Sequence, residues 1–271
     1  VLFVVMMWLG TLAHVAAAIA PFAMRGTLNA YLQSFPIEIR GDLQAMASTR
    51  IAAFTSAQMA NLPTMQVATL TSLQVPGLTT GQLASMTTAN LNAMGTDQFK
   101  ALTSVQIQAL GTNQIANLET TDLAALSSTQ VQALSSAQIG ALTSDQIPAM
   151  STDQYSWLST AQVRAIGTAQ IGLIETADFA MLGTAQIRAL GSAQIAALSS
   201  TQFTNLVSTQ LTALASNQIA ALSTDNVIAM TGDQIGQLTT GQIRSLTTAQ
   251  FANIETVDTA ETTSDVVEEE V

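Results

Sequence analysis

The 271-residue sequence contains no cysteine and only one histidine, His14. The missing cysteines exclude disulfides, thiolate metal sites and cysteine nucleophiles, and a lone N-terminal histidine leaves no His-dependent triad in the rest of the chain. The sequence also has no phosphate-binding glycine loop and no His/Glu metal motif. We therefore expect no catalytic residues and no cofactor, and we predict that the protein is not an enzyme.

Charge is scarce as well. Only 9% of the residues are charged, whereas about a quarter are charged in an ordinary globular chain. The formal net charge of -11 would repel the phosphates of nucleic acid. Nucleic acid is therefore not an expected partner, and most of the surface must consist of Ser, Thr, Gln, Asn and backbone.

Residues 1–24 carry no Asp, Glu, Lys or Arg, and they include Trp8, His14 and Pro21. A helix of this length is long enough to cross a bilayer. A cleaved secretory signal is the alternative, but no basic region precedes the apolar stretch. We expect a retained hydrophobic helix that either anchors the chain in a membrane or packs within a protein assembly. The expected partners are accordingly a membrane or proteins, further copies of this chain included, bound through residues 1–24.

After a connector at residues 25–45, an eight-residue repeat runs without interruption from Met46 to Asn253, which gives 26 units. The unit reads Leu, any, Ser/Thr, any, Gln, Ile/Val, any, Ala, and one copy spans Leu134 to Ala141. Position three falls on every residue number divisible by eight and is Ser or Thr in all units but one, which has Gly232. Residues 254–271 turn acidic and are interpreted as a C-terminal cap or tail.

The eight-residue period excludes one continuous helix and one continuous strand. On a helix each unit would turn the Leu position by about 80°, and on a strand the first and sixth positions would face opposite sides. The chain must therefore bend once per unit. A single unit buries too little apolar surface to offset the entropy of ordering it, so the units must stack. This predicts an all-α solenoid of very short capped helical turns, one per eight residues.

Within each unit, Ser or Thr at position three is predicted to cap the helical turn. The representative caps are Ser136, Thr160, Thr184 and Thr248. A cap at position two, with a capping box to Gln, is the alternative. Positions six and one should form the core, and Gln should lie outside with Ser and Thr. The representative core residues are Leu134, Ile139, Leu142, Ile187, Leu190 and Ile195.

The rival architecture is a β-solenoid with two repeats per coil. Pro76 and Pro148 at position seven favour it, because proline is awkward in the fourth position of a helical turn. The Ala and Gln content favours the helical form.

The repeat resembles the octapeptide arrays of the form Leu-Thr-Thr-x-Gln-Ile/Val-x-Ala found in bacterial exported and cell-surface proteins. Leu246-Thr-Thr-Ala-Gln-Phe-Ala-Asn253 illustrates the pattern. The resemblance covers residues 46–253, and it implies a spacer, stalk or scaffold on the bacterial surface with no shared active site.

Weak metal candidates are aspartates at position four of adjacent units, Asp145 with Asp153 and Asp225 with Asp233. If adjacent units stacked, paired carboxylates could hold calcium, but we interpret them as exposed side chains and expect no metal. Rows of hydroxyl groups that bind ice are a further minor alternative.

The favoured function is a structural repeat protein anchored in the bacterial envelope. The alternative is a subunit of a filament or membrane complex whose N-terminal helix packs against protein neighbours.

Overall fold

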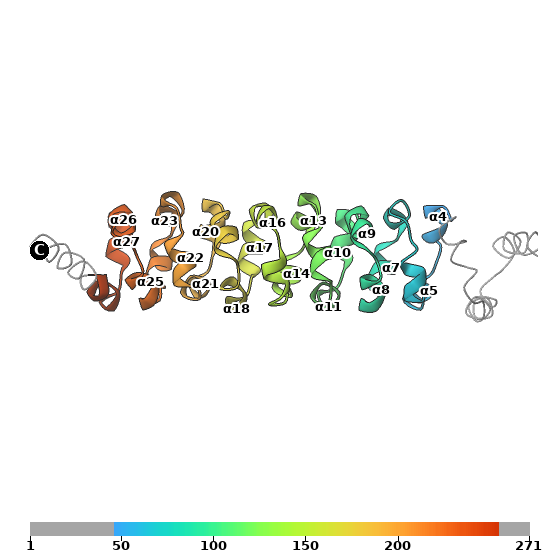
Figure 1. Ribbon diagram of the computed structural model, residues 1–271, viewed down its shortest axis with the longest axis horizontal. Helices are drawn as coiled ribbons and strands as arrows, with labels where there is room; N and C mark the ends of the chain where they lie inside the picture. Colours follow the sequence, from blue (N-terminus) through green and yellow to red (C-terminus); the bar gives the residue numbers. More distant parts are fainter. Residues whose placement is uncertain (1–45, 255–271) are drawn as a thin grey trace, which may run out of the picture. The chain divides into compact units, whose positions relative to one another are not determined.

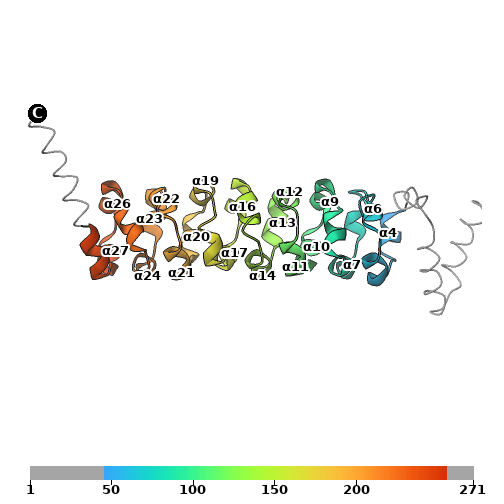
Figure 2. The ribbon, with the colours of Figure 1, turned by 60° about the horizontal axis from the view of Figure 1, so that its bottom comes forward.

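The computed structural model describes residues 46–254, and within this range every regular element is a short helix. The predicted membrane segment with Trp8, His14 and Pro21, the connector at 25–45 and the tail beyond residue 254 lie outside the described residues. All but two of the helices begin at intervals of eight residues, and together they form an elongated array, shown from two sides in Figures 1 and 2. The all-α solenoid with one helical turn per unit is therefore confirmed for this part of the chain.

Three units make one coil, because each helix packs against the helix three units before it and the helix three units after it. The helices consequently lie in three rows along the array. Row A contains α5 (Ser56–Ala60), α7 (Thr80–Ser85), α10 (Ser104–Ala109), α13 (Ser128–Ala133), α16 (Thr152–Trp157), α19 (Thr176–Ala180), α22 (Ser200–Thr204) and α25 (Thr224–Ile228). Row B contains α6 (Thr64–Val67), α8 (Thr88–Asn92), α11 (Thr112–Ala116), α14 (Ser136–Gly140), α17 (Thr160–Ala165), α20 (Thr184–Ala189), α23 (Ser208–Ala213) and α26 (Gly232–Gln237).

Row C contains α4 (Ser48–Ile51), the 3₁₀-helix η2 (Val75–Gly77), α9 (Thr96–Ala101), α12 (Thr120–Ala124), α15 (Gln146–Ala149), α18 (Thr168–Ile171), α21 (Ser192–Ala196), α24 (Ser216–Ile219) and α27 (Thr240–Ser245). Residues 248–254 are also helical. A side chain in one unit therefore has its axial neighbours 24 residues away, and adjacent units lie in different rows.

The bend between helices comes from two extended residues at positions one and two. Leu134 has φ −60° and ψ 129°, and Ser135 has φ −69° and ψ 158°. These are ordinary β-region values for any L-residue. The chain therefore turns at every unit without needing glycine in a left-handed conformation.

The two prolines at position seven, Pro76 and Pro148, lie in shortened helices and not in strands. Pro76 lies in η2, and Pro148 lies in α15, which begins at Gln146 instead of at position three. Proline lacks the N–H that would continue the helical bonding. The unit accommodates it because so few intrahelical bonds are made in any case.

The core lies along the axis and is built from positions six and one. The representative residues Leu134, Ile139, Leu142, Ile187, Leu190 and Ile195 are all buried. Row A also carries a column of aromatic side chains at position six, because Tyr155, Phe179 and Phe203 are spaced by one coil and are each fully buried. The core is thus continuous through successive coils, as a solenoid requires.

Candidate functional site

The most distinctive polar feature of the array is the glutamine at position five, which is buried and bonded at both ends. The Gln138 amide nitrogen Nε2 donates to the carbonyls of Ile107 and Leu110, each at 2.8 Å. Its Oε1 accepts from the backbone N–H of Ser135 at 2.7 Å. One side chain therefore accepts a hydrogen bond from the start of its own helix and donates hydrogen bonds to backbone carbonyls 28 and 31 residues earlier.

The same arrangement recurs in many units. It is complete at Gln82, Gln106, Gln114, Gln130, Gln146, Gln154, Gln162, Gln186, Gln194, Gln202, Gln218, Gln242 and Gln250. We call this series the glutamine ladder. The expectation that Gln lies on the exterior is wrong, because an amide whose donor and acceptor are both paired can be buried at little cost.

The helix caps lie at position two, not at position three. The predicted caps Ser136, Thr160 and Thr184 are the first residues of α14, α17 and α20. The cap predicted at Thr248 also lies one residue earlier, because the hydroxyl of Thr247 accepts from the N–H of Gln250 at 3.2 Å. The favoured cap assignment is therefore wrong, and the capping-box alternative describes the structure.

The capping box tolerates any residue at position two because its reciprocal half uses only the backbone. Gly111 and Val207 have no hydroxyl, yet their N–H groups donate to the position-five Gln at 2.8 and 3.0 Å. Glu119 at position two is outside the Ser/Thr pattern of the box, and its side chain makes no cap bond. There the box is absent, as position five is Asp122.

Position three serves contacts between coils instead. The hydroxyls of Ser104, Ser136 and Ser192 donate to backbone carbonyls 25 residues later, at 3.3, 3.3 and 3.4 Å. These bonds are exposed, so each contributes less than a buried one.

The cap assignment can be tested with two adjacent serines. Ser135→Ala removes the acceptor for the N–H of Gln138 and should lower the free energy of unfolding by about 1 kcal/mol. Ser136→Ala removes only the exposed bond to Ala161 and should cost about 0.5 kcal/mol or less. Urea denaturation of both variants measures the difference. A larger loss for Ser136→Ala would contradict the cap at position two.

The aspartates considered as calcium ligands are not brought together. Asp145, Asp153, Asp225 and Asp233 are all exposed, and the two members of each proposed pair lie in different rows because axial neighbours are three units apart. Among the described residues, no three His, Cys, Asp or Glu side chains are grouped so that they could hold a metal ion. The predicted pairing of adjacent units is therefore wrong, and its error lies in the number of units per coil.

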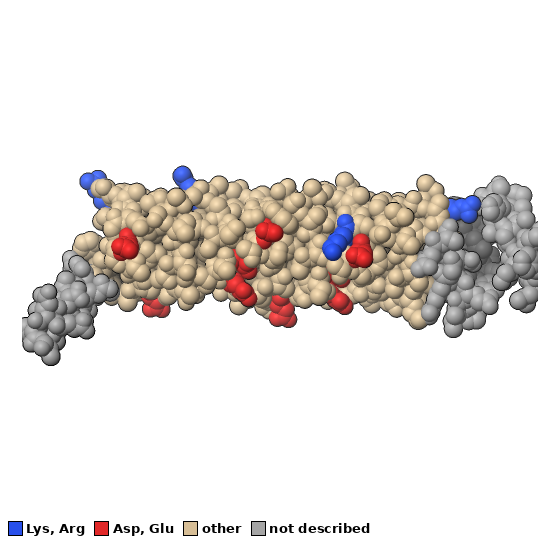
Figure 3. Space-filling model, turned by 45° about the horizontal axis from the view of Figure 1, so that its top comes forward, with Lys and Arg blue, Asp and Glu red and all other residues tan. Residues whose placement is uncertain are grey.

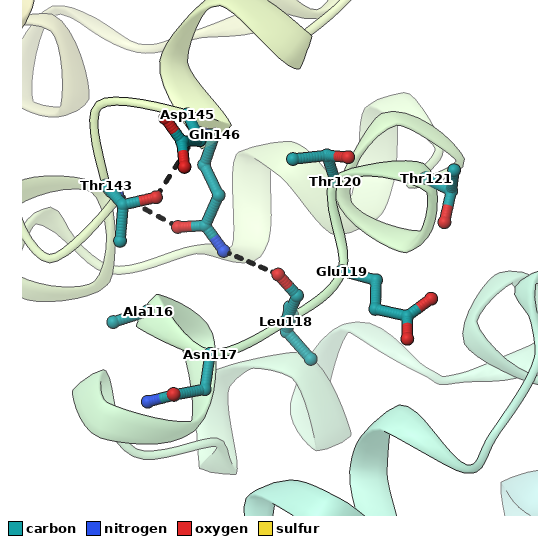
Figure 4. Close-up of a pocket in the computed structure, with 9 residues that line it drawn as sticks. All are labelled: Ala116, Asn117, Leu118, Glu119, Thr120, Thr121, Thr143, Asp145 and Gln146. Atoms are coloured by element: carbon teal, nitrogen blue, oxygen red, sulfur yellow. Dashed lines mark hydrogen bonds between the residues drawn. The ribbon is translucent and has the colours of Figure 1, made fainter.

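Charged side chains are sparse. Figure 3 shows a few acidic and basic side chains scattered over a face that is mostly uncharged. An open depression beside α12 and α15 is lined partly by Glu119, Thr121, Thr143 and Asp145. Figure 4 shows the ladder bond from Gln146 to the Leu118 carbonyl among the residues that line it, so this depression lies where one coil is bonded to the next.

The two aromatic residues of α16, Tyr155 and Trp157, have different surroundings. Tyr155 is fully buried, and its hydroxyl donates to the Ile147 carbonyl at 2.5 Å. Burial is the main cause that raises the pKa of the Tyr155 phenol. Trp157 ends α16 and is half-buried. Tyr155 is thus part of the core.

Within the described range, no helix is both long and apolar enough to cross a bilayer. A comparison with curated proteins found no match. The family model described as the ALTTAQ repeat matches four segments, residues 75–112, 115–152, 171–208 and 205–240. The matched segments cover just over half of the chain and lie entirely within the array of short helices. The chain therefore belongs to the ALTTAQ repeat family.

Proposed function

We propose that this chain is a non-enzymatic scaffold or spacer of the bacterial envelope, held there by the hydrophobic segment at residues 1–24. The observation that carries this proposal is the uniform coil. Most units repeat the same buried core and the same ladder bonds, so chain length is converted into axial length at a fixed rate of 24 residues per coil. Such quasi-one-dimensional arrays extend by adding repeats.

The sparse surface charge also supports a spacing role. Most of the buried polar side chains are the ladder glutamines, whose hydrogen bonds are made within the array. Among the described residues, Asn92 Oδ1 is the one buried side-chain polar atom without a hydrogen-bond partner. In the part of the chain that the structure describes, no three His, Cys, Asp or Glu side chains are grouped so that they could hold a metal ion, and catalysis would need converging titratable groups in a concave site. The buried polar side chains of the described residues therefore serve mainly to hold successive coils together.

Attachment is tested by fractionating cells that express either the full chain or a chain that begins at residue 46. We expect the full chain in the membrane fraction and the shortened chain in the soluble fraction. Detergent should release the full chain as a monodisperse monomer. Retention in a large assembly after detergent would instead support the alternative function, a subunit whose N-terminal segment packs against proteins, and equal solubility of the two chains would contradict anchoring.

The spacer property is tested by removing one coil. Deleting residues 126–149 joins position eight to position one and should leave a cooperatively folded array that is shorter by about 10 Å, the distance between packed helices. Small-angle X-ray scattering measures the change in maximum dimension. Deleting residues 126–137 is the matched control, because it joins position eight to position five and breaks the period. Similar behaviour of the two deletions would contradict a modular spacer.

A further inference from the structure

Two units of the described array, those of Asp122 and Asp178, carry a buried carboxyl group at position five, where most units carry an amide. Asp122 occupies position five of its unit, in α12, and it is buried with 2% of its surface exposed. The Thr96 hydroxyl in α9, one coil earlier, donates to its Oδ1 at 3.0 Å. Asp122 therefore lies in the contact between α9 and α12.

Asn226 shows what a side chain of the same size does at this position. Its Oδ1 accepts from the Ser200 hydroxyl at 3.3 Å, which matches the bond from Thr96 to Asp122. Its Nδ2 donates to the carbonyl of Leu198, 28 residues earlier, at 3.1 Å. By the same register, the carbonyl that belongs to Asp122 is that of Met94. An ionised carboxylate has no hydrogen to donate to it, whereas a neutral carboxyl has one.

We propose that Asp122 forms a pH-sensitive link between two coils. In its neutral form it donates its carboxyl O–H to the Met94 carbonyl. On ionisation it loses that hydrogen bond, and α12 is then held less tightly to α9. The proton comes from solvent and no covalent bond changes. The proposal concerns a property of the array itself and does not depend on the spacer function.

The charged groups around Asp122 are known from the elements packed against it. α9 carries Asp97 and Lys100, Asp145 immediately precedes α15, and Glu119 precedes α12 in the same unit. Burial raises the pKa of the Asp122 carboxyl, the hydrogen bond from Thr96 lowers it, and the nearby charge of Glu119 raises it again. Because the folded pKa lies above the unfolded value, the added stability is fully present below the unfolded pKa and is lost as pH rises through the folded pKa.

The test compares the full chain with Asp122→Asn, which supplies a donor at every pH. Thermal unfolding is followed by circular dichroism at about pH 3.5, below the usual aspartate pKa, and at about pH 8. We expect the variant to melt about 2–4 °C above the wild type at the higher pH, and the gain to vanish at the lower pH. A gain of equal size at both pH values, or no gain at either, would overturn the proposal.

Two further variants assign the effect to this residue. Asp145→Asn removes an exposed acid from the neighbouring helix of the same row, and it should reproduce less than half of the gain at the higher pH. Thr96→Val removes the hydrogen bond that favours the carboxylate, so the midpoint of the pH-dependent melting should move to higher pH. An unchanged midpoint, or an Asp145→Asn gain as large as that of Asp122→Asn, would place the titrating group elsewhere and overturn the proposal.

Discussion

Replacing Gln130 with alanine should lower the free energy of unfolding by about 3–6 kcal/mol, because each buried partner left unsatisfied costs about 1–3 kcal/mol. The Gln130 amide donates to the carbonyls of Phe99 and Leu102, each at 2.7 Å, and its oxygen accepts from the N–H of Ser127 at 2.9 Å. Alanine leaves all three backbone groups without their partner. Denaturant unfolding followed by circular dichroism measures the loss.

The matched control is Gln132→Ala in the same helix. Gln132 is exposed, and its replacement by a better helix former should change stability by no more than about 0.5 kcal/mol. Because each unit interacts mainly with its neighbours in the array, loss of a central rung should also split one unfolding transition into two. Equal effects of the two substitutions would refute the ladder as a stabilising element.

Truncating Phe203 to alanine should cost about 3–5 kcal/mol, the usual range for emptying an aromatic site in a packed core. Phe203 is fully buried at position six of row A, one coil after Phe179 and two coils after Tyr155. The cavity would open between neighbours that are themselves large and constrained. Thermal or denaturant unfolding of the variant provides the measurement.

Phe251 provides the control within the same row and at the same position of the unit. It lies near the end of the described array and is 47% exposed. Phe251→Ala should therefore cost about 1 kcal/mol or less, because little apolar surface leaves a packed environment. A loss as large as that of Phe203→Ala would show that position six does not form a continuous core.

The sequence was sufficient to predict the element type and the core positions. An eight-residue period is incompatible with continuous regular structure, and the spacing from position six to the next position one places Ile139 and Leu142 on one face. Both are buried, and each described unit of the array contains one helical turn. These features follow from local geometry, which a repeat displays many times over.

The number of units per coil could not be predicted in the same way. It depends on the angle set by the extended backbone at Leu134 and Ser135 and their equivalents, and no residue type is restricted to those φ and ψ values. The error had consequences elsewhere. The assumption that adjacent units stack led to the pairing of Asp145 with Asp153. The three-row arrangement places these two residues in different rows.

The role of Gln was missed because polarity was taken as a sign of exposure. The available signal was chemical: position two changes freely among Gly, Val, Ser and Thr, whereas position five is nearly always an amide. A site that merely faces water accepts many polar side chains. Strict retention of a group that both donates and accepts indicates two fixed partners, one of each kind.

The ladder bonds all run in one direction along the chain. Gln138 reaches back to carbonyls 31 and 28 residues earlier, and the other ladder glutamines do the same. During synthesis the backbone carbonyls that bond to a ladder glutamine have therefore left the ribosome before that glutamine does. A longer array keeps the same sequence separation between partners, so its relative contact order falls as coils are added, and vectorial folding is not slowed by length.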